Sequence, residues 1–380
     1  MHRQLSNRTS VRAIAARIES PVRSHVFWSG LISAAAAAYI ALSGGVAFGQ
    51  ETAVLPSMSG FVYTADEYGN SMSAINLTDG HVQTLPVAIS PHNIQISADG
   101  RRLFAVGNPA AMEGHDQAQT GQETEMEGMK GLLLVFDPDK LASGPLASIE
   151  VGEHPAHVVV DRTGSRAFVT LAEENAVAVV DLARQKVSQT IPTGAYPHGL
   201  RLTPDGSVAY VANVEDGSVS VLDTEKLTEV ARIPVGRAPV QVGFTPDGGQ
   251  VFVSLRDENK VAVVDTATRK VLGKVEVGRG PIQVFVTPDG RFVYVANQGS
   301  KDDPADTVSV ISVATRSVVE TIRTGAGAHG VVVSTDGRTV FVTNIAAGTV
   351  SMVDVESQSV VKEFVVGKGP NGVTFRPSGS

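Results

Sequence analysis

Residues 207–248 read SVAYVANVEDGSVSVLDTEKLTEVARIPVGRAPVQVGFTPDG and contain four short segments rich in β-branched residues. The segments are SVAYVAN, SVSVLD, EVARIPVG and APVQVGF, and turn residues such as EDG and TPDG follow them. Apolar and polar residues alternate within the segments, which is typical of strands, and Asp-Gly favours a tight reversal of the chain. The stretch therefore predicts one four-stranded antiparallel sheet.

The same unit recurs along the chain. Its closing turn ends at Gly100, Gly164, Gly206, Gly248, Gly290, Gly337 and Gly379, with a spacing of 42 residues except for one interval of 64 and one of 47. We interpret the longer intervals as insertions, because a period of about 42 residues is typical of a β-propeller blade. The expected repeats cover residues 61–100, 101–164, 165–206, 207–248, 249–290, 291–337 and 338–379.

The phase of the repeat predicts how the ring closes. The first repeat opens with FVYTAD (61–66), which matches the first strand of the unit, and the last ends with PNGVTF (370–375), which matches the fourth. The N- and C-terminal strands are therefore expected to share one blade. The predicted fold class is all-β: a seven-bladed β-propeller of four-stranded antiparallel blades, in which each sheet is buried against its neighbours.

Three repeats contain the motif YVAN or FVTN, at 210–213, 294–297 and 341–344, each followed by a VSVLD-like segment. In these motifs the chain resembles the YVTN-repeat (YncE-like) seven-bladed β-propellers, and the resemblance covers residues 61–379. It implies a secreted or periplasmic binding scaffold. Seven-bladed lactonases among the related propellers imply a hydrolase as an alternative, and YncE-like proteins also imply single-stranded DNA binding.

Composition excludes several classes of chemistry. The 380 residues include no cysteine, which excludes disulfides, thiolate nucleophiles, Cys-ligated zinc and covalently attached c-type haem. Lys and Arg total 31 against 39 Asp and Glu, for a net charge of −8, and the only tryptophan is Trp28. This balance argues against a nucleic-acid partner, which would require a cationic surface or stacking side chains.

The first 49 residues have the outline of a signal peptide. Five arginines and one acid precede or flank an apolar stretch centred on residues 31–42, and small residues lead to a cleavage site before Gln50. Removal of residues 1–49 would leave a linker (50–60), the propeller (61–379) and a net charge of −12. We expect a periplasmic or secreted protein without stable membrane insertion, and an uncleaved N-terminal anchor is the alternative.

Two insertions fall on one face of the expected ring, which marks it as the working face. The short one is SKDDPA (300–305), and the long one covers residues 108–130. The long insertion supplies side chains that could bind copper or zinc, namely Met112, His115, Met126 and Met129.

Histidines recur in the loop before the fourth strand of the unit, on the same face. The loops read SPHN, HPAH, YPHG, APVQ, GPIQ, GAHG and GPNG, and contain His92, His154, His157, His198, His329 and Asn371. Because such residues surround one mouth of the axial channel, His92, His157, His198 and His329 are candidate zinc or copper ligands. Arg237, Arg279 and Lys368 occupy another equivalent loop position and complete a candidate ligand-binding mouth.

These observations favour a non-enzymatic scaffold, expected to be a monomer, that binds a ligand or protein partner at the mouth bearing the insertions. A periplasmic metal-binding or metallochaperone protein is the first alternative. A lactonase-like hydrolase is the second, although the chain contains no G-x-S-x-G, Walker or H-E-x-x-H motif. The sequence leaves enzymatic activity open, names no catalytic residue, and favours its absence.

Overall fold

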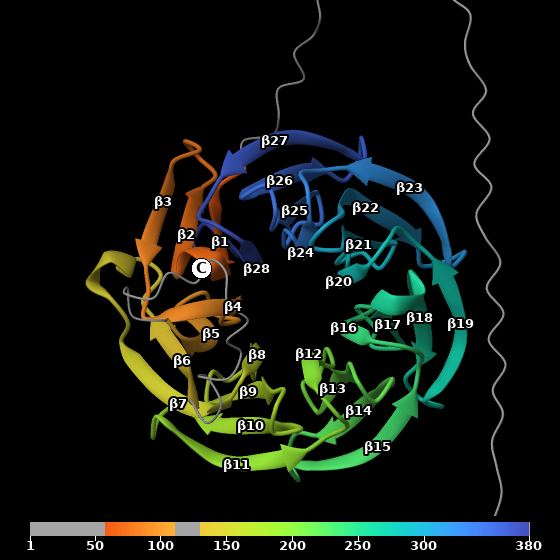
Figure 1. Cartoon of the computed structure of the whole chain (residues 1–380), viewed down its shortest axis with the longest axis horizontal. Coiled ribbons are helices and arrows are strands. Elements are labelled where there is room, and N and C mark those ends of the chain that lie inside the picture. The colour runs from red at the N-terminus through yellow and green to blue at the C-terminus, as the bar shows by residue number, and fades with distance from the viewer. Residues whose placement is uncertain (1–57, 111–129, 380) are drawn as a thin grey trace, which may run out of the picture. The chain divides into compact units, whose positions relative to one another are not determined.

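The computed structural model describes residues 58–110 and 130–379, which form seven four-stranded antiparallel sheets. The sheets follow one another around a central axis as the blades of a propeller, with one strand of each nearest the axis (Figure 1). The innermost strands contact one another in sequence around the whole ring. The predicted fold class, a seven-bladed all-β propeller, is confirmed.

Each blade is numbered from the N-terminal end, and its strands are named from the innermost outward. Blade 1 contains β28 (Pro370–Pro377), β1 (Gly60–Asp66), β2 (Ser71–Asn76) and β3 (Val82–Pro86). Blade 2 contains β4 (Ile89–Ile96), β5 (Leu103–Pro109), β6 (Lys130–Phe136) and β7 (Ala147–Glu153). Blade 3 contains β8 (Pro155–Val160), β9 (Arg166–Leu171), β10 (Ala176–Asp181) and β11 (Lys186–Pro192). Blade 4 contains β12 (Pro197–Leu202), β13 (Val208–Asn213), β14 (Ser218–Asp223) and β15 (Thr228–Pro234).

Blades 5 to 7 follow the same order. Blade 5 contains β16 (Pro239–Phe244), β17 (Gln250–Leu255), β18 (Lys260–Asp265) and β19 (Lys270–Glu276). Blade 6 contains β20 (Pro281–Val286), β21 (Phe292–Gly299), β22 (Pro304–Ser312) and β23 (Ser317–Arg323). Blade 7 contains β24 (Ala328–Val333), β25 (Thr339–Asn344), β26 (Thr349–Asp354) and β27 (Ser359–Val365). The helices of the described residues are short 3-10 turns: η1 (Glu67–Gly69), η3 (Leu141–Ser143) and η4 (Arg256–Glu258).

Blade 1 closes the ring as the repeat phase predicted. Strand β28, from the C-terminal end of the propeller, pairs antiparallel with β1 in a register that runs from Gly60 opposite Pro377 to Thr64 opposite Val373. The two ends of the repeat array are thus held in one sheet, and blade 1 has four strands like the other six blades.

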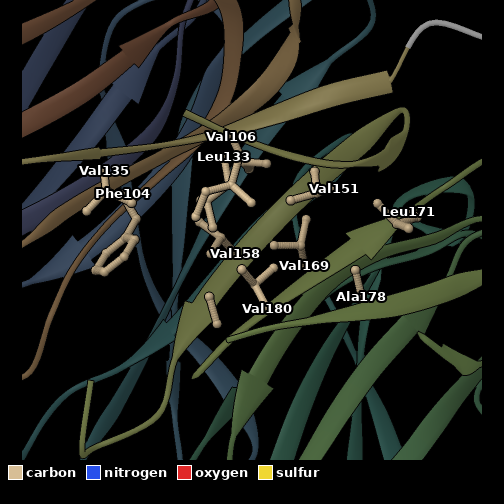
Figure 2. Close-up of a cluster of buried hydrophobic side chains, with 12 residues drawn as sticks. Phe104, Val106, Leu133, Val135, Val151, Val158, Val169, Leu171, Ala178 and Val180 are labelled. Atoms are coloured by element: carbon tan, nitrogen blue, oxygen red, sulfur yellow. The ribbon is translucent and has the colours of Figure 1, made fainter. Parts of the chain in front are cut away.

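The hydrophobic core consists of seven clusters, and each lies between two adjacent blades. Figure 2 shows the cluster between blades 2 and 3, where Phe104 and Leu133 of blade 2 approach Val158 and Val169 of blade 3. Successive residues of a strand point to opposite faces, so Phe168 beside Val169 packs toward blade 4. Burial of both faces explains why the middle strands are almost continuously apolar.

Every innermost strand contains a bulge near its beginning. In β12 the register moves from Pro197 opposite Asn213 to Leu200 opposite Val211, so one additional residue is accommodated in β12. The shift recurs in the other six blades. A bulge bends the strand and redirects its side chains. In each blade it affects the residues at the start of the inner strand, which are the repeat equivalents of SPHN (90–93); we call these segments the SPHN-type loops.

No helix in residues 58–110 and 130–379 is long and apolar enough to cross a membrane.

Candidate metal site at the ring axis

Three histidines from consecutive blades converge where the inner strands begin. His92 lies on β4, His157 on β8 and His198 on β12, and Figure 1 places these three strands side by side around the axis. One ring nitrogen from each lies within 4.8 Å of the other two. The ring centroids of His157 and His198 are 4.8 Å apart, and those of His92 and His198 are 5.1 Å apart. We refer to His92, His157 and His198 as the histidine cluster.

The Glu67 carboxylate fixes the orientation of His92. Nδ1 of His92 lies 3.0 Å from Oε1 of Glu67, and the other carboxylate oxygen accepts a 2.7 Å hydrogen bond from Nδ2 of Asn371. Because a carboxylate only accepts, His92 donates from Nδ1. A neutral His92 ring then presents an unprotonated Nε2 to the rest of the cluster.

His198 is held in the same tautomer by the backbone. Its Nδ1 lies 3.2 Å from the carbonyl oxygen of Val240, which only accepts, so His198 also donates from Nδ1. Its Nε2 lies 3.1 Å from Nε2 of His92. Two nitrogens that both carry lone pairs in the neutral rings therefore face each other at hydrogen-bond distance.

His157 is the third and most deeply buried member of the cluster. The residue is fully buried, and its Nε2 has no hydrogen-bond partner among the described residues. The contact between its Nδ1 and Nε2 of Gln241 is long, at 3.4 Å. A buried imidazole nitrogen without a partner is costly in an apolar interior unless a ligand satisfies it.

The electrostatic environment keeps the inner histidines neutral. Burial lowers the pKa of His157 well below 6.5, and nearby His198 and His92 lower it further. Burial also lowers the pKa of His198 well below 6.5, with additional contributions from His92 and His329. At neutral pH these two side chains are therefore in the unprotonated form that binds transition metals.

Glu67 is a site residue that the sequence did not predict. It begins η1, immediately after β1, and its side chain is 24% exposed. Burial tends to raise its pKa, but the attraction of His92 in its protonated form and hydrogen bonds from His92 and Asn371 outweigh burial and lower the pKa to about 2. The residues at the equivalent position of five other blades are Ala172, Val214, Arg256, Gln298 and Ile345. An alignment of the repeats would have shown that, among these residues, only Glu67 carries a carboxylate.

The other candidate residues of the SPHN-type loops lie around the histidine cluster. His329, on β24 of blade 7, is 6% exposed, its Nδ1 has no hydrogen-bond partner among the described residues, and burial lowers its pKa to about 4. Asn371 reaches the cluster through Nδ2, which donates to Oε2 of Glu67 at 2.7 Å and lies 3.2 Å from Nδ1 of His92. His154 lies outside it, with a side chain that is 44% exposed and an Nδ1 that is 4.0 Å from Oε1 of Glu173.

The three candidate cations lie at the exposed rim. Arg237 donates from Nη2 to the Asp257 carbonyl oxygen at 2.9 Å, and Arg279 forms an ion pair with Asp303. Lys368 is also exposed. None of the described hydrogen bonds or ion pairs of Arg237 and Arg279 reaches a histidine, so these side chains do not extend the cluster.

The candidate ligands of the long insertion remain predictions, because Met112, His115, Met126 and Met129 lie outside the described residues. The described strands β5 and β6 end and begin, at Pro109 and Lys130, on the face that bears the histidine cluster.

The fold and this cluster define a seven-bladed propeller with a histidine-rich axial end. A family model described as YNCE-like beta-propeller matches residues 140–289 and 286–377, which together are more than half of the chain. The chain therefore belongs to the YncE-like β-propeller family. Comparison with the curated proteins gave no match.

Solved structures share the fold at low sequence identity. Hydrazine synthase of Kuenenia stuttgartiensis matches with a TM-score of 0.61 and 20% identity, over 76% of this chain and 96% of that one. A functionally unknown protein of Desulfotomaculum acetoxidans matches with a TM-score of 0.65 and 16% identity, over 83% and 99%. A protein of Bacteroides fragilis described as a "putative 6-phosphogluconolactonase" matches with a TM-score of 0.66 and 15% identity, over 85% and 99%. These likenesses establish the propeller fold alone.

Proposed function

We propose that this protein is an exported binding propeller whose histidine cluster holds one zinc or copper ion. The observation that carries the proposal is the 3.1 Å approach of Nε2 of His92 to Nε2 of His198, with both Nδ1 atoms engaged as donors. In the neutral rings this arrangement opposes two lone pairs. A cation between them would replace the repulsion with two coordinate bonds.

The dimensions and chemistry suit a transition metal. With Zn–N bonds of about 2.0–2.1 Å, adjacent ligand nitrogens of a tetrahedral site are about 3.3 Å apart. The His92 and His198 pair is close to this separation, and His157, with one ring nitrogen within 4.8 Å of the other two, supports a third ligand. Three protein ligands leave one position for water or for a ligand from solution, which suits a site that exchanges its metal.

A proton is the competing explanation for the short distance between the two Nε2 atoms, because a protonated His92 would donate a hydrogen bond from Nε2 to Nε2 of His198. Titration of Zn²⁺ and Cu²⁺ against a competing chelator distinguishes the two explanations. We expect one ion per chain, and an affinity at least 100-fold lower in His92→Ala, His157→Ala and His198→Ala. His81→Ala, which removes an exposed histidine just before the outer strand β3, is the control. Equal affinities in wild type and cluster variants would reject the proposal.

A hydrolase is the second candidate, supported by unpartnered polar atoms on two other inner strands, β20 and β28. Nε2 of Gln283 and Oδ1 of Asn371 are buried without hydrogen-bond partners among the described residues. A metal with an open position could activate water for attack on an ester or lactone. Turnover of a γ-lactone by the zinc-loaded protein, abolished in His92→Ala, would support this activity, and absence of turnover would leave the binding role alone.

A further inference from the structure

A second cavity lies at the opposite end of the inner strands from the histidine cluster. His198 is near the beginning of β12, whereas Arg201 and Leu202, at its end, line this cavity. The ends of β16 and β20 and the turns that follow them complete the lining, and the cavity volume is about 310 Å³. This size is at the lower end of the range for pockets that bind small molecules.

Gly243 lies within the cavity lining and contributes no side chain to it. Gly243 pairs with Phe252 of the second strand of blade 5. The residues that occupy the same place in blades 4 and 6 are Arg201 and Phe285. Blade 5 therefore lacks a side chain between a guanidinium and an aromatic ring. The remaining lining is mostly apolar and includes Phe244 and Val286.

Arg201 is the one charged residue of this lining. Its described hydrogen bond runs from Nη1 to the backbone carbonyl of the preceding residue, Leu200, at 3.1 Å. None of the ion pairs among the described residues includes Arg201, whereas Arg166 and Arg376 each form one and Arg232 forms two. Burial lowers the pKa of Arg201 to about 10, so the side chain remains charged at neutral pH.

A partly buried guanidinium without a carboxylate partner is a favourable place for an anion. The apolar lining would accommodate an uncharged body attached to that anion. We propose that this cavity, the Arg201 pocket, binds a small organic carboxylate, with Arg201 donating to the carboxylate and Phe244 and Phe285 contacting an aliphatic or aromatic body. The inference goes beyond the metal site and involves none of the three histidines.

Calorimetric titration of octanoate into the chelator-treated, full-length protein tests the proposal, because removal of metal prevents carboxylate binding to an ion at the cluster. We expect saturable binding of one octanoate per chain, and at least tenfold weaker binding of octan-1-ol and octylammonium. Arg201→Gln should weaken octanoate binding by roughly 10- to 100-fold, as expected for loss of a charge-assisted interaction. Arg101→Gln, which removes an exposed arginine, should leave it unchanged.

Gly243→Val supplies a test that does not depend on Arg201. The position has no positive φ, but a Cβ there would lie 3.2 Å from the carbonyl oxygen and 3.3 Å from Cγ2 of Val284, which also lines the cavity, so the variant narrows the cavity and its fold is checked first by circular dichroism. We expect it to weaken octanoate binding by at least tenfold and to retain wild-type metal affinity. The proposal is overturned if octanoate shows no saturable binding, if octan-1-ol binds equally well, or if Gly243→Val and a folded Arg201→Gln both bind like wild type.

Discussion

The Glu67 carboxylate accepts a 2.7 Å hydrogen bond from Nδ2 of Asn371, a residue 304 positions further along the chain. Glu67 directly follows β1, and Asn371 belongs to β28, the strand that closes the ring against β1. The same carboxylate contacts Nδ1 of His92 at 3.0 Å. The strand pair that closes the propeller therefore also orients the first proposed metal ligand.

Glu67→Gln should weaken metal binding without unfolding the protein. The amide retains the size of the carboxylate but lacks its charge, so it holds the His92 ring less firmly in the metal-binding tautomer. Loss of such a hydrogen-bond partner typically lowers metal affinity by about 10- to 100-fold. Glu215→Gln, an exposed substitution on the same face, is the matched control in a chelator competition assay. Equal affinity in both variants would contradict the role of Glu67.

Asp66 occupies in blade 1 the place that Asn213 occupies in blade 4. Asp66 accepts hydrogen bonds from the Ser71 and Ser73 hydroxyls, whereas Nδ2 of Asn213 donates to those of Ser218 and Ser220. Burial raises the pKa of Asp66 to about 6, although these hydroxyls oppose the shift. The folded state binds this proton more tightly than the unfolded state, so the resulting stabilisation is present below about pH 4 and is lost as the pH rises to about 6.

Asp66→Asn should therefore stabilise the protein at neutral pH. An amide matches the serine pair found in blade 4 and removes the buried charge, so we expect the free energy of unfolding at pH 7.5 to rise by about 1–3 kcal/mol. The gain should shrink toward zero at pH 4. Thermal unfolding at both pH values measures this, and the reciprocal Asn213→Asp should lower stability at pH 7.5. A less stable Asp66→Asn at that pH would refute the explanation.

The period of the repeat predicted the blades and the ring closure because strand alternation and turn chemistry are local properties. Of the four segments quoted from residues 207–248, three became β13, β14 and β15 of blade 4, and the fourth became β16, the innermost strand of blade 5, so the stretch does not form one sheet by itself. The bulges were not predicted, because a bulge places two residues of one strand opposite one residue of its partner, and this pairing depends on both strands. His329 shares the repeat position of His92 and His198 but lies in blade 7, and blade 1, with Asn371 at that position, separates it from blade 2.

The partners of the charged loop residues could not be predicted from the sequence. Arg237 and Arg279 share one repeat position, and the sequence predicted that they line the mouth. In the fold, both are exposed, and acidic loops of blades 5 and 6 provide their partners. The pairing depends on loop conformation after assembly of the ring, which residue spacing alone does not determine.

Deletion of residues 370–380 should open the ring. Loss of β28 leaves β1 without its inner partner and removes the ion pair between Arg376 and Asp139 of blade 2. We expect aggregation, or a melting temperature at least about 10 °C lower, because several apolar contacts are lost together. Deletion of residues 378–380, beyond β28, is the control. Thermal unfolding followed by circular dichroism, together with size-exclusion chromatography, would show the difference. An unchanged melting temperature after deletion of residues 370–380 would contradict the role of β28 in ring closure.

Gly199→Ala should disturb both packing and the histidine cluster. A Cβ at Gly199 would lie 2.4 Å from the Val240 carbonyl oxygen, which accepts the hydrogen bond from His198. We expect a loss of about 1–3 kcal/mol in stability together with weaker metal binding. Gly273→Ala is the control, because nothing lies within 4 Å of its Cβ. Chemical denaturation and metal titration of both variants test this. If Gly199→Ala has the stability and metal affinity of the wild type, the Val240 carbonyl moves without cost and the prediction is wrong.

Anomalous diffraction from crystals of the full-length protein grown with one equivalent of zinc would locate the ion itself. We expect an anomalous peak at the zinc edge within about 2.0–2.1 Å of Nε2 of both His92 and His198, with a nitrogen of His157 as a further ligand. The peak should disappear in His198→Ala crystals. A peak confined to exposed residues such as His81 or His154, or no peak between His92 and His198, would contradict the metal site.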